Sequence, residues 1–192
     1  MKYKVFVCDL DGSKCDPKAV SRQLCAAAVN AYCRMEGIEI PLKKEVEGFV
    51  PEDFLEGEKG KPYLKGHPVH FNVSHSGLLW LCMVGESPCG IDIQQEKDCG
   101  YERIAERHFN EAEQLYVKRE GISGFFKLWT VKEAYGKYTG QGFYGEMPSF
   151  VTENGSIVTR AGDAFIREIE IGPGIYCACC TEGKDDEIQL IG

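Results

Sequence analysis

Long hydrophobic runs are absent from this sequence of 192 residues. No run reaches about 18 consecutive apolar residues, the shortest stretch that spans a bilayer as a helix. The opening residues, MKYKVFVCDLDG, carry acidic side chains where a secretory signal needs a longer apolar region and a small-residue cleavage site. We therefore expect a soluble, cytoplasmic protein with no membrane partner.

Positive charge is also in short supply. The chain has 22 Lys and Arg against 30 Asp and Glu, which gives a formal net charge of -8. Nucleic acids and anionic membranes select proteins with a broad excess of cations, so this composition argues against both partners. Any anionic ligand must be held by a local group of cations.

Cysteine is abundant, with 10 residues, but signs of a disulfide scaffold or a zinc site are missing. A chain of this length without an export signal is expected to keep its thiols reduced, as small buried apolar side chains. The one cluster, Cys177, Cys179 and Cys180, lies in a strand-like run with no histidine nearby, which argues against zinc.

The most informative stretch that is present is FFKLWTVKEAYGKYTGQGF, residues 125–143. Its apolar residues fall mainly at helical spacings, and residues 125–135 contain no Pro or Gly, so the pattern predicts a helix. Glu133 and Lys137 are four residues apart and share a face, with Lys132 adjacent to Glu133. We expect the carboxylate and the two cations to converge on one polar ligand; the alternative is a surface ion pair.

Residues 69–74 alternate between apolar and polar side chains, and residues 78–84 return as a nearly continuous apolar strand. The pattern predicts a hairpin whose turn, residues 74–77, presents the Ser74 hydroxyl and the His75 imidazole to an anion. The alternative is that both side chains only satisfy backbone groups of the turn.

A third strand is predicted at residues 89–94, with Ile91 and Ile93 on one face and Asp92 and Gln94 on the other. A carboxylate beside an amide suits a hard cation such as Mg²⁺, which takes one or two protein carboxylates and completes its shell with water and phosphate. The alternative is that Asp92 only forms a turn at the end of the strand.

Helices are also predicted at residues 18–35, ending at Gly37, and in two pieces within residues 101–120. The break between the two pieces falls at Asn110, which forms a capping box with Glu113. Pro62 fixes the backbone after Lys61 and so aims that lysine more definitely than a flexible loop does. Strands are predicted for much of residues 149–181, and the acidic tail, residues 182–192, is expected to be peripheral.

Three segments in this order, GKPYL with HFNVSHSG, then CGIDIQ, then LWTVKEAYGKYTGQGF, resemble the surfactin-synthetase-type 4'-phosphopantetheinyl transferases. The resemblance covers roughly residues 60–143. It implies an α+β fold built as a pseudo-twofold pair of similar halves, residues 1–86 and 87–192, with antiparallel sheets and packed helices. Two such halves in one chain favour a monomer.

The resemblance implies a Mg²⁺-dependent enzyme that binds coenzyme A in the cleft between the halves. It would move 4'-phosphopantetheine from coenzyme A to a serine of an apo acyl or peptidyl carrier protein and release adenosine 3',5'-bisphosphate. By position in the motifs, Asp92 and Glu133 would bind the metal, and Glu133, or a water that it polarises, would take the serine proton. The residues that would contact coenzyme A are Lys61 with Pro62, Ser74, His75, Lys132 and Lys137.

The chain departs from the family pattern at two places. Gln94 stands where relatives have Glu, so the metal site loses one negative charge and we expect weaker Mg²⁺ binding. The first half also lacks a basic helical stretch that relatives use for the 3'-phosphate, for which Arg22 or Lys18 are substitutes. The carrier protein would contact residues 101–109, with Ile104 and Phe109 as candidates for either contact or core.

Two other functions remain open for this sequence. A non-catalytic coenzyme A-binding relative would explain Gln94, but it would not require Asp92, Glu133 and Lys137 together. A serine hydrolase built from Ser74, His75 and Asp92 is disfavoured because adjacent side chains diverge and no G-x-S-x-G elbow is present.

Overall fold

The computed structural model describes residues 1–10, 17–41, 47–57, 60–143 and 147–192. Its contacts divide the chain into two compact units, Met1–Cys89 together with Asp185–Gly192, and Gly90–Lys184. The prediction placed residues 185–192 in the second half, as a peripheral tail. That placement is wrong, because these residues form a strand of the first unit.

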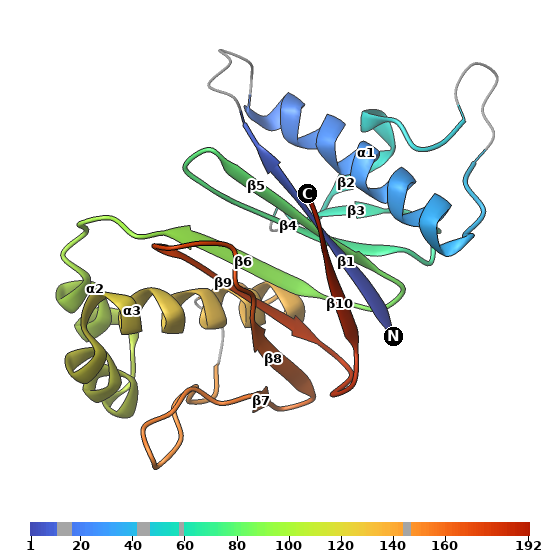
Figure 1. Cartoon of the computed structure of the whole chain (residues 1–192). Coiled ribbons are helices and arrows are strands. Elements are labelled where there is room, and N and C mark those ends of the chain that lie inside the picture. The colour runs from blue at the N-terminus through green and yellow to red at the C-terminus, as the bar shows by residue number, and fades with distance from the viewer. Residues whose placement is uncertain (11–16, 42–46, 58–59, 144–146) are drawn as a thin grey trace. The chain divides into compact units, whose positions relative to one another are not determined.

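The first unit is built on a sheet with strand order β10-β1-β5-β4 (Figure 1). Strand β10 runs parallel to β1, whereas the β1–β5 and β5–β4 pairs are antiparallel. A separate antiparallel pair is formed by β2 and β3. The elements of this unit are β1 Lys2–Asp9, α1 Pro17–Glu36, a 3-10 turn Pro51–Asp53, β2 Phe54–Glu56, β3 Pro62–Leu64, β4 His70–Ser76, β5 Leu79–Gly85 and β10 Glu187–Ile191.

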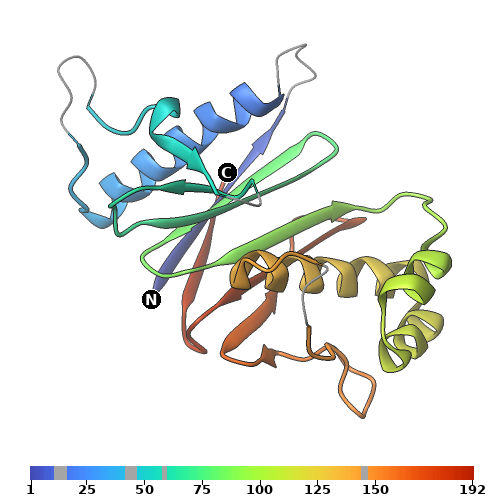
Figure 2. The same ribbon diagram turned by 180° about the vertical axis from the view of Figure 1, so that it is seen from behind.

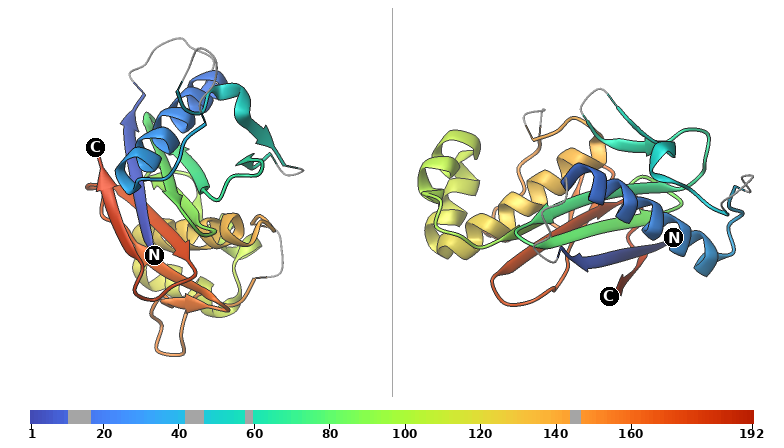
Figure 3. Two further views of the ribbon diagram at one scale, coloured as in Figure 1. Left: turned by 90° about the vertical axis from the view of Figure 1, so that its right-hand side faces the viewer. Right: turned by 90° about the horizontal axis from the view of Figure 1, so that it is seen from above.

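Helix α1 lies against one face of this sheet (Figure 3). Its buried residues recur at helical spacing and pack with strand residues in one hydrophobic cluster, which includes Val29, Tyr32 and Trp80. The Trp80 indole Nε1 donates a hydrogen bond of 3.0 Å to Ser21 Oγ on the helix, which orients the two elements. The predicted helix and its end at Gly37, where φ is 69°, are confirmed.

The second unit is an antiparallel sheet of order β6-β9-β8-β7 with helices beside it. Figure 2 shows α3 lying along β6. Buried residues such as Leu128, Val131 and Ala134 recur every three residues and form the core with the sheet. The elements of this unit are β6 Gly90–Gln95, α2 Tyr101–His108, α3 Glu111–Thr139, β7 Arg160–Ala161, β8 Ala164–Glu168 and β9 Ile175–Thr181.

Helix α3 begins where the sequence predicts, and it is interrupted at Gly121. Asn110 is its N-cap, and the reciprocal bonds with Glu113 form the capping box. At Gly121 the backbone leaves the helical region, with φ 70° and ψ -152°, a conformation that glycine adopts without steric strain. The helix therefore has two parts, one before and one after Gly121.

The chain is a mixed α and β protein with mainly antiparallel sheets, as predicted. Among the described residues, none of the helices has the length and apolar character that a transmembrane segment needs. The cysteines in the described part of the chain are free thiols, and most of them are buried.

Candidate active site

The site begins with a close contact between β6 and α3. A Cβ atom added to Gly90 would lie 2.1 Å from the Ala134 carbonyl oxygen and 2.5 Å from the Tyr138 backbone nitrogen. Both neighbours are helix backbone, which cannot move aside cheaply. Glycine at this position therefore lets the helix contact the strand directly, two residues before Asp92.

Asp92 is the centre of the polar cluster that this contact creates. Its side chain is 4% exposed, and Lys137 Nζ donates hydrogen bonds to Asp92 Oδ1 at 2.7 Å and to the Ile91 carbonyl at 3.0 Å. The Gln94 amide donates to Asp92 Oδ2 at 3.2 Å, so Asp92 and Gln94 share a face of the strand. The strand and the helix thus bring together three residues that the sequence marked separately.

Glu133 completes the cluster from the helix. Its side chain is half-buried, and burial raises the pKa of its carboxyl above the ordinary value. The Asp92 carboxylate raises that pKa further by repulsion, while the Lys137 ammonium lowers it. The two carboxylates are therefore close enough to repel each other, and a cation bound between them would relieve the repulsion.

The donor set fits Mg²⁺, because it consists of two carboxylates and one amide, all oxygen donors. Within the described ranges, no three His, Cys, Asp or Glu side chains come together as a metal-binding group. That finding agrees with the cluster of two acids, Asp92 and Glu133, beside the neutral Gln94. The amide must present its oxygen rather than its nitrogen to coordinate a metal.

Lys132 does not join this cluster, which contradicts the expectation that it contacts the pyrophosphate of coenzyme A. Its Nζ atom donates to Glu113 Oε1 at 3.1 Å and to Oε2 at 2.9 Å, and both side chains are buried. The side chains of adjacent helix residues point about 100° apart, so Lys132 and Glu133 lie on different faces of α3. The pattern located Lys132 on the helix but gave no information about its partner.

Ser74 and His75 lie within β4 rather than in a turn, which corrects the predicted hairpin. Ser74 pairs with Leu81 and His75 with Trp80 across the two strands, and the turn follows at Gly77, where φ is 58°. Successive strand residues face opposite sides, so Ser74 is 5% exposed while His75 faces outward. The two side chains therefore do not form one anion-binding turn.

Lys61 and Pro62 belong to the first unit and line a small cavity there of about 220 Å³, together with His70. Pro62 is the first residue of β3, where a missing N–H is tolerated, and Lys61 precedes it directly. Lys61 lies just outside this strand, and its carbonyl accepts a hydrogen bond of 3.0 Å from the Gly57 backbone N–H. For the 3'-phosphate candidates, Arg22 donates to Glu56 at 2.8 Å, and the side chain of Lys18 lies outside the described residues.

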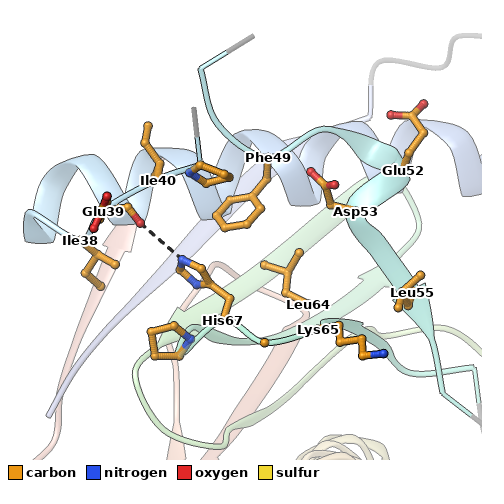
Figure 4. Close-up of a pocket in the computed structure, with 13 residues that line it drawn as sticks. Ile38, Glu39, Ile40, Phe49, Glu52, Asp53, Leu55, Leu64, Lys65 and His67 are labelled. Carbon is orange, nitrogen blue, oxygen red and sulfur yellow. Dashed lines mark hydrogen bonds between the residues drawn. The ribbon is translucent and has the colours of Figure 1, made fainter. Parts of the chain in front are cut away.

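A larger cavity of about 790 Å³ in the first unit was not predicted (Figure 4). Its walls are mostly apolar and include Ile38, Phe49 and Leu64, with the His67 ring packed edge-on against Phe49 at 4.7 Å. The predicted coenzyme A residues are not part of its lining. Its walls come from loops and short elements, which periodic patterns do not bring together.

Ile104 and Phe109 were each candidates for either a carrier-protein contact or a core residue, and the structure buries them to different degrees. Phe109 is 5% exposed and belongs to the hydrophobic core, while Ile104 is partly buried against that core. The Phe109 ring stacks on Phe125 with centroids 5.6 Å apart. Phe109 is therefore a core residue.

Comparison with known proteins gives consistent matches. Residues 88–179 match the model of the 4'-phosphopantetheinyl transferase superfamily. The chain is 33% identical to the 4'-phosphopantetheinyl transferase gsp of Aneurinibacillus migulanus over 138 residues, which are 67% of this chain and 57% of that protein. It is 33% identical to the 4'-phosphopantetheinyl transferase Sfp of Bacillus subtilis over 152 residues, 72% of this chain and 67% of that protein.

These matches thus span between 57% and 67% of the length of the two relatives. The segment matched by the family model contains the whole cluster of Asp92, Gln94, Glu133 and Lys137. The fold, the polar cluster and both relatives lead to one assignment. The chain belongs to the 4'-phosphopantetheinyl transferase superfamily and is of its surfactin-synthetase (Sfp) type.

Proposed function

We propose that the protein transfers the 4'-phosphopantetheine group of coenzyme A to a serine of an apo acyl or peptidyl carrier protein and releases adenosine 3',5'-bisphosphate. The observation that carries the proposal is the cluster of Asp92, Glu133 and Lys137 inside the segment matched by the family. A bound Mg²⁺ would neutralise the negative charge that spreads over the pyrophosphate during the transfer. Asp92 and Glu133 would hold it, with Gln94 as a third, neutral donor.

The residues of this chain supply the other parts of the reaction. The serine oxygen attacks the β-phosphorus of coenzyme A, and the bond from that phosphorus to the bridging oxygen breaks. Glu133, or a water that it polarises, accepts the serine proton, and burial of its carboxyl, which raises the pKa, favours uptake of that proton. Lys137 supplies a positive charge beside these acids and offers it to the phosphate oxygens.

The first unit contributes Lys61, Ser74 and His75 to coenzyme A in this proposal. Lys61 beside Pro62 is the best supported of these, since it lines a cavity and its carbonyl is hydrogen-bonded. We also propose the family's pseudo-twofold architecture, with residues 185–192 belonging to the first half, a cytoplasmic location and a monomer. Support for two similar halves is that each unit has a four-stranded sheet and one long helix.

The experiment that tests this function is a mass measurement on a carrier protein. The protein is incubated with coenzyme A, Mg²⁺ and several apo carrier proteins, and each carrier is weighed afterwards. We expect a gain of one phosphopantetheine group with the unmodified chain and none with Glu133→Ala. Glu120→Ala, at an exposed glutamate on the same helix, is the control and should retain transfer.

The second candidate function is a non-catalytic coenzyme A-binding protein, and Gln94 is the observation that favours it. Coenzyme A binding by calorimetry without a mass gain on any carrier would support this alternative. The same measurement would reject the transferase.

A further inference from the structure

In the second unit, the buried Glu113 carboxylate accepts four hydrogen bonds, and the transfer reaction does not use it. Its side chain is 0% exposed, and Oε1 accepts hydrogen bonds from Lys132 Nζ and from the Phe150 backbone N–H, each at 3.1 Å. Oε2 accepts from Lys132 Nζ at 2.9 Å and from the Asn110 N–H at 3.1 Å. Both oxygens are therefore fully used in holding other parts of the chain.

Lys132 is enclosed on its other sides by aromatic rings. Its Nζ lies 5.3 Å from the centroid of Phe109, 5.2 Å from Phe150 and 6.0 Å from Phe143. Ring faces attract a cation, and this attraction grows where water is excluded. The ammonium is thus fixed in direction by the Glu113 carboxylate and by the rings around it.

The pair crosses the break in α3. Glu113 lies in the part of the helix before Gly121, and Lys132 lies in the part after it. A helix interrupted by one non-helical residue does not transmit its rotation across the interruption, because the two parts share no continuous hydrogen-bond ladder there. The Glu113–Lys132 pair, 19 residues apart in sequence, supplies a fixed connection between the two parts.

The second part of α3 carries Lys132 and Glu133 side by side. Since consecutive helix residues are separated by about 100° of rotation and about 1.5 Å of rise, fixing Lys132 also fixes the direction of Glu133. The contact at Gly90 sets how closely the same helix approaches β6, the strand of Asp92. The pair sets the rotation of the helix, and the glycine contact sets its distance.

We propose that Glu113 and Lys132 are positioning residues, which hold the second part of α3 so that the Glu133 carboxylate faces Asp92 and the two bind a divalent cation together. The inference rests on the proposed function for the identity of the metal pair. A buried ion pair is often no more stabilising than apolar residues of the same size, so stability alone gives little reason for this pair. Its four converging hydrogen bonds fix a geometry instead.

The test uses Mn²⁺ as the probe, because free Mn²⁺ is counted directly by electron paramagnetic resonance without any transfer reaction. The main variant is the double substitution Glu113→Gln with Lys132→Met, which removes both charges and so leaves no unpaired buried ion. We expect it to unfold within a few degrees of the unmodified chain and to show an Mn²⁺ Kd raised about tenfold, as for residues that orient metal ligands.

Two further variants keep the test decisive. Glu113→Asp retains both charges but withdraws the carboxylate by one methylene group, and it should raise the Mn²⁺ Kd several-fold even if the double variant does not fold. Lys127→Met removes an exposed lysine of the same helix that pairs loosely with Glu168 at 3.7 Å, and it should leave the Kd unchanged. An unchanged Kd in folded variants of the pair overturns the inference and leaves a purely structural ion pair.

The outcome also separates this inference from the proposed function. Carrier modification by the unmodified chain together with an unchanged Kd in the folded pair variants overturns the positioning role alone. An Mn²⁺ Kd that depends on Glu113 and Lys132, without carrier modification by the unmodified chain, supports the positioning role and overturns the transferase.

Discussion

Two lysines in the second part of α3, Lys132 and Lys137, each pair with a carboxylate from another segment of the chain. The surroundings of the two pairs differ. The Lys132–Glu113 pair is closed, with side chains 6% and 0% exposed. The Lys137–Asp92 pair is more open, with side chains 26% and 4% exposed, and the Glu133 carboxylate lies near it. The same residue types are therefore enclosed in one case and accessible to a ligand in the other.

Burial and neighbours explain the difference. The closed pair has backbone N–H groups and aromatic rings around it, so its charges are satisfied within the protein. The open pair has a second carboxylate that repels the first, and burial raises the pKa of that second carboxyl. A lysine beside two acids is a candidate for binding an anion and a cation together, whereas an enclosed lysine is not.

A large loss of stability is expected for Gly90→Ala, because the added methyl group would push α3, which carries both lysines, away from β6. The added Cβ would meet helix backbone at 2.1 Å, and overpacking of this kind costs about 3 kcal/mol of unfolding free energy. Urea unfolding followed by circular dichroism measures the loss. Gly172→Ala is the control, since its Cβ would lie 3.7 Å from the nearest atom, Ile175 Cδ1, and it should cost less than about 1 kcal/mol. A small loss at Gly90 would contradict the close contact.

Removing each lysine in turn should separate the two pairs. Lys132→Met leaves the buried Glu113 charge without its partner and should cost about 3–5 kcal/mol of unfolding free energy. Lys137→Met removes a more exposed lysine and leaves Asp92 with its bond from Gln94, so it should cost less, about 1–3 kcal/mol. For transfer, Lys137→Met should lower kcat by about 100-fold, the usual effect of losing one charge-stabilising group. Urea unfolding and the carrier mass assay give both values, and equal stability losses would remove the distinction between the pairs.

Adding a charge to the open pair sharpens the comparison further. Gln94→Glu replaces the amide that donates to Asp92 Oδ2 at 3.2 Å with a third carboxylate. The added negative charge should lower the Mg²⁺ concentration that gives the half-maximal rate, by about tenfold. Without Mg²⁺, repulsion among the acids should lower the unfolding temperature, and Mg²⁺ should restore it. An unchanged or higher Mg²⁺ requirement would count against coordination at this position.

The smallest effect is expected at a third pair, in the first unit. Lys4 Nζ lies 2.8 Å from Glu36 Oε1, and this hydrogen bond lowers the pKa of the Glu36 carboxyl. Its stabilising contribution is therefore complete above the ordinary carboxyl pKa of about 4.5 and is lost as the pH falls through the lowered pKa of the folded state. The difference in unfolding free energy between the unmodified chain and Glu36→Gln should vanish at low pH. A difference that grows on acidification would contradict this assignment.

Much of the second unit could be predicted from sequence, because its signals are local. The Asn110 capping box, the helix around Glu133 and the shared face of Asp92 and Gln94 all follow from spacing within one element. The partner of Lys132 could not be predicted in this way. Helical periodicity tells which residues share a face, but not which distant carboxylate lies opposite it.

The first unit was predicted less well, for related physical reasons. The hairpin register depends on where glycine permits the turn, and Gly77 places that turn after Ser74 and His75 instead of among them. The strand β10 was missed although Glu187–Leu190 alternates polar and apolar residues, because the strand is short and follows an acidic stretch. Its partner β1 lies more than 180 residues away, paired from Lys2 with Glu187 to Phe6 with Ile191. Pairings of this range leave little trace in local patterns.

The pairing of β10 with β1 has a consequence for the order of synthesis. Strand β10 follows residues 90–184 in the chain, so the four-stranded sheet of the first unit cannot be completed while the chain is still growing through those residues. The second unit is one continuous segment and can fold as soon as it has left the ribosome. Until β10 has been made, the edge of β1 that it covers stays open to mispairing, and aggregation of the nascent chain is expected to begin there.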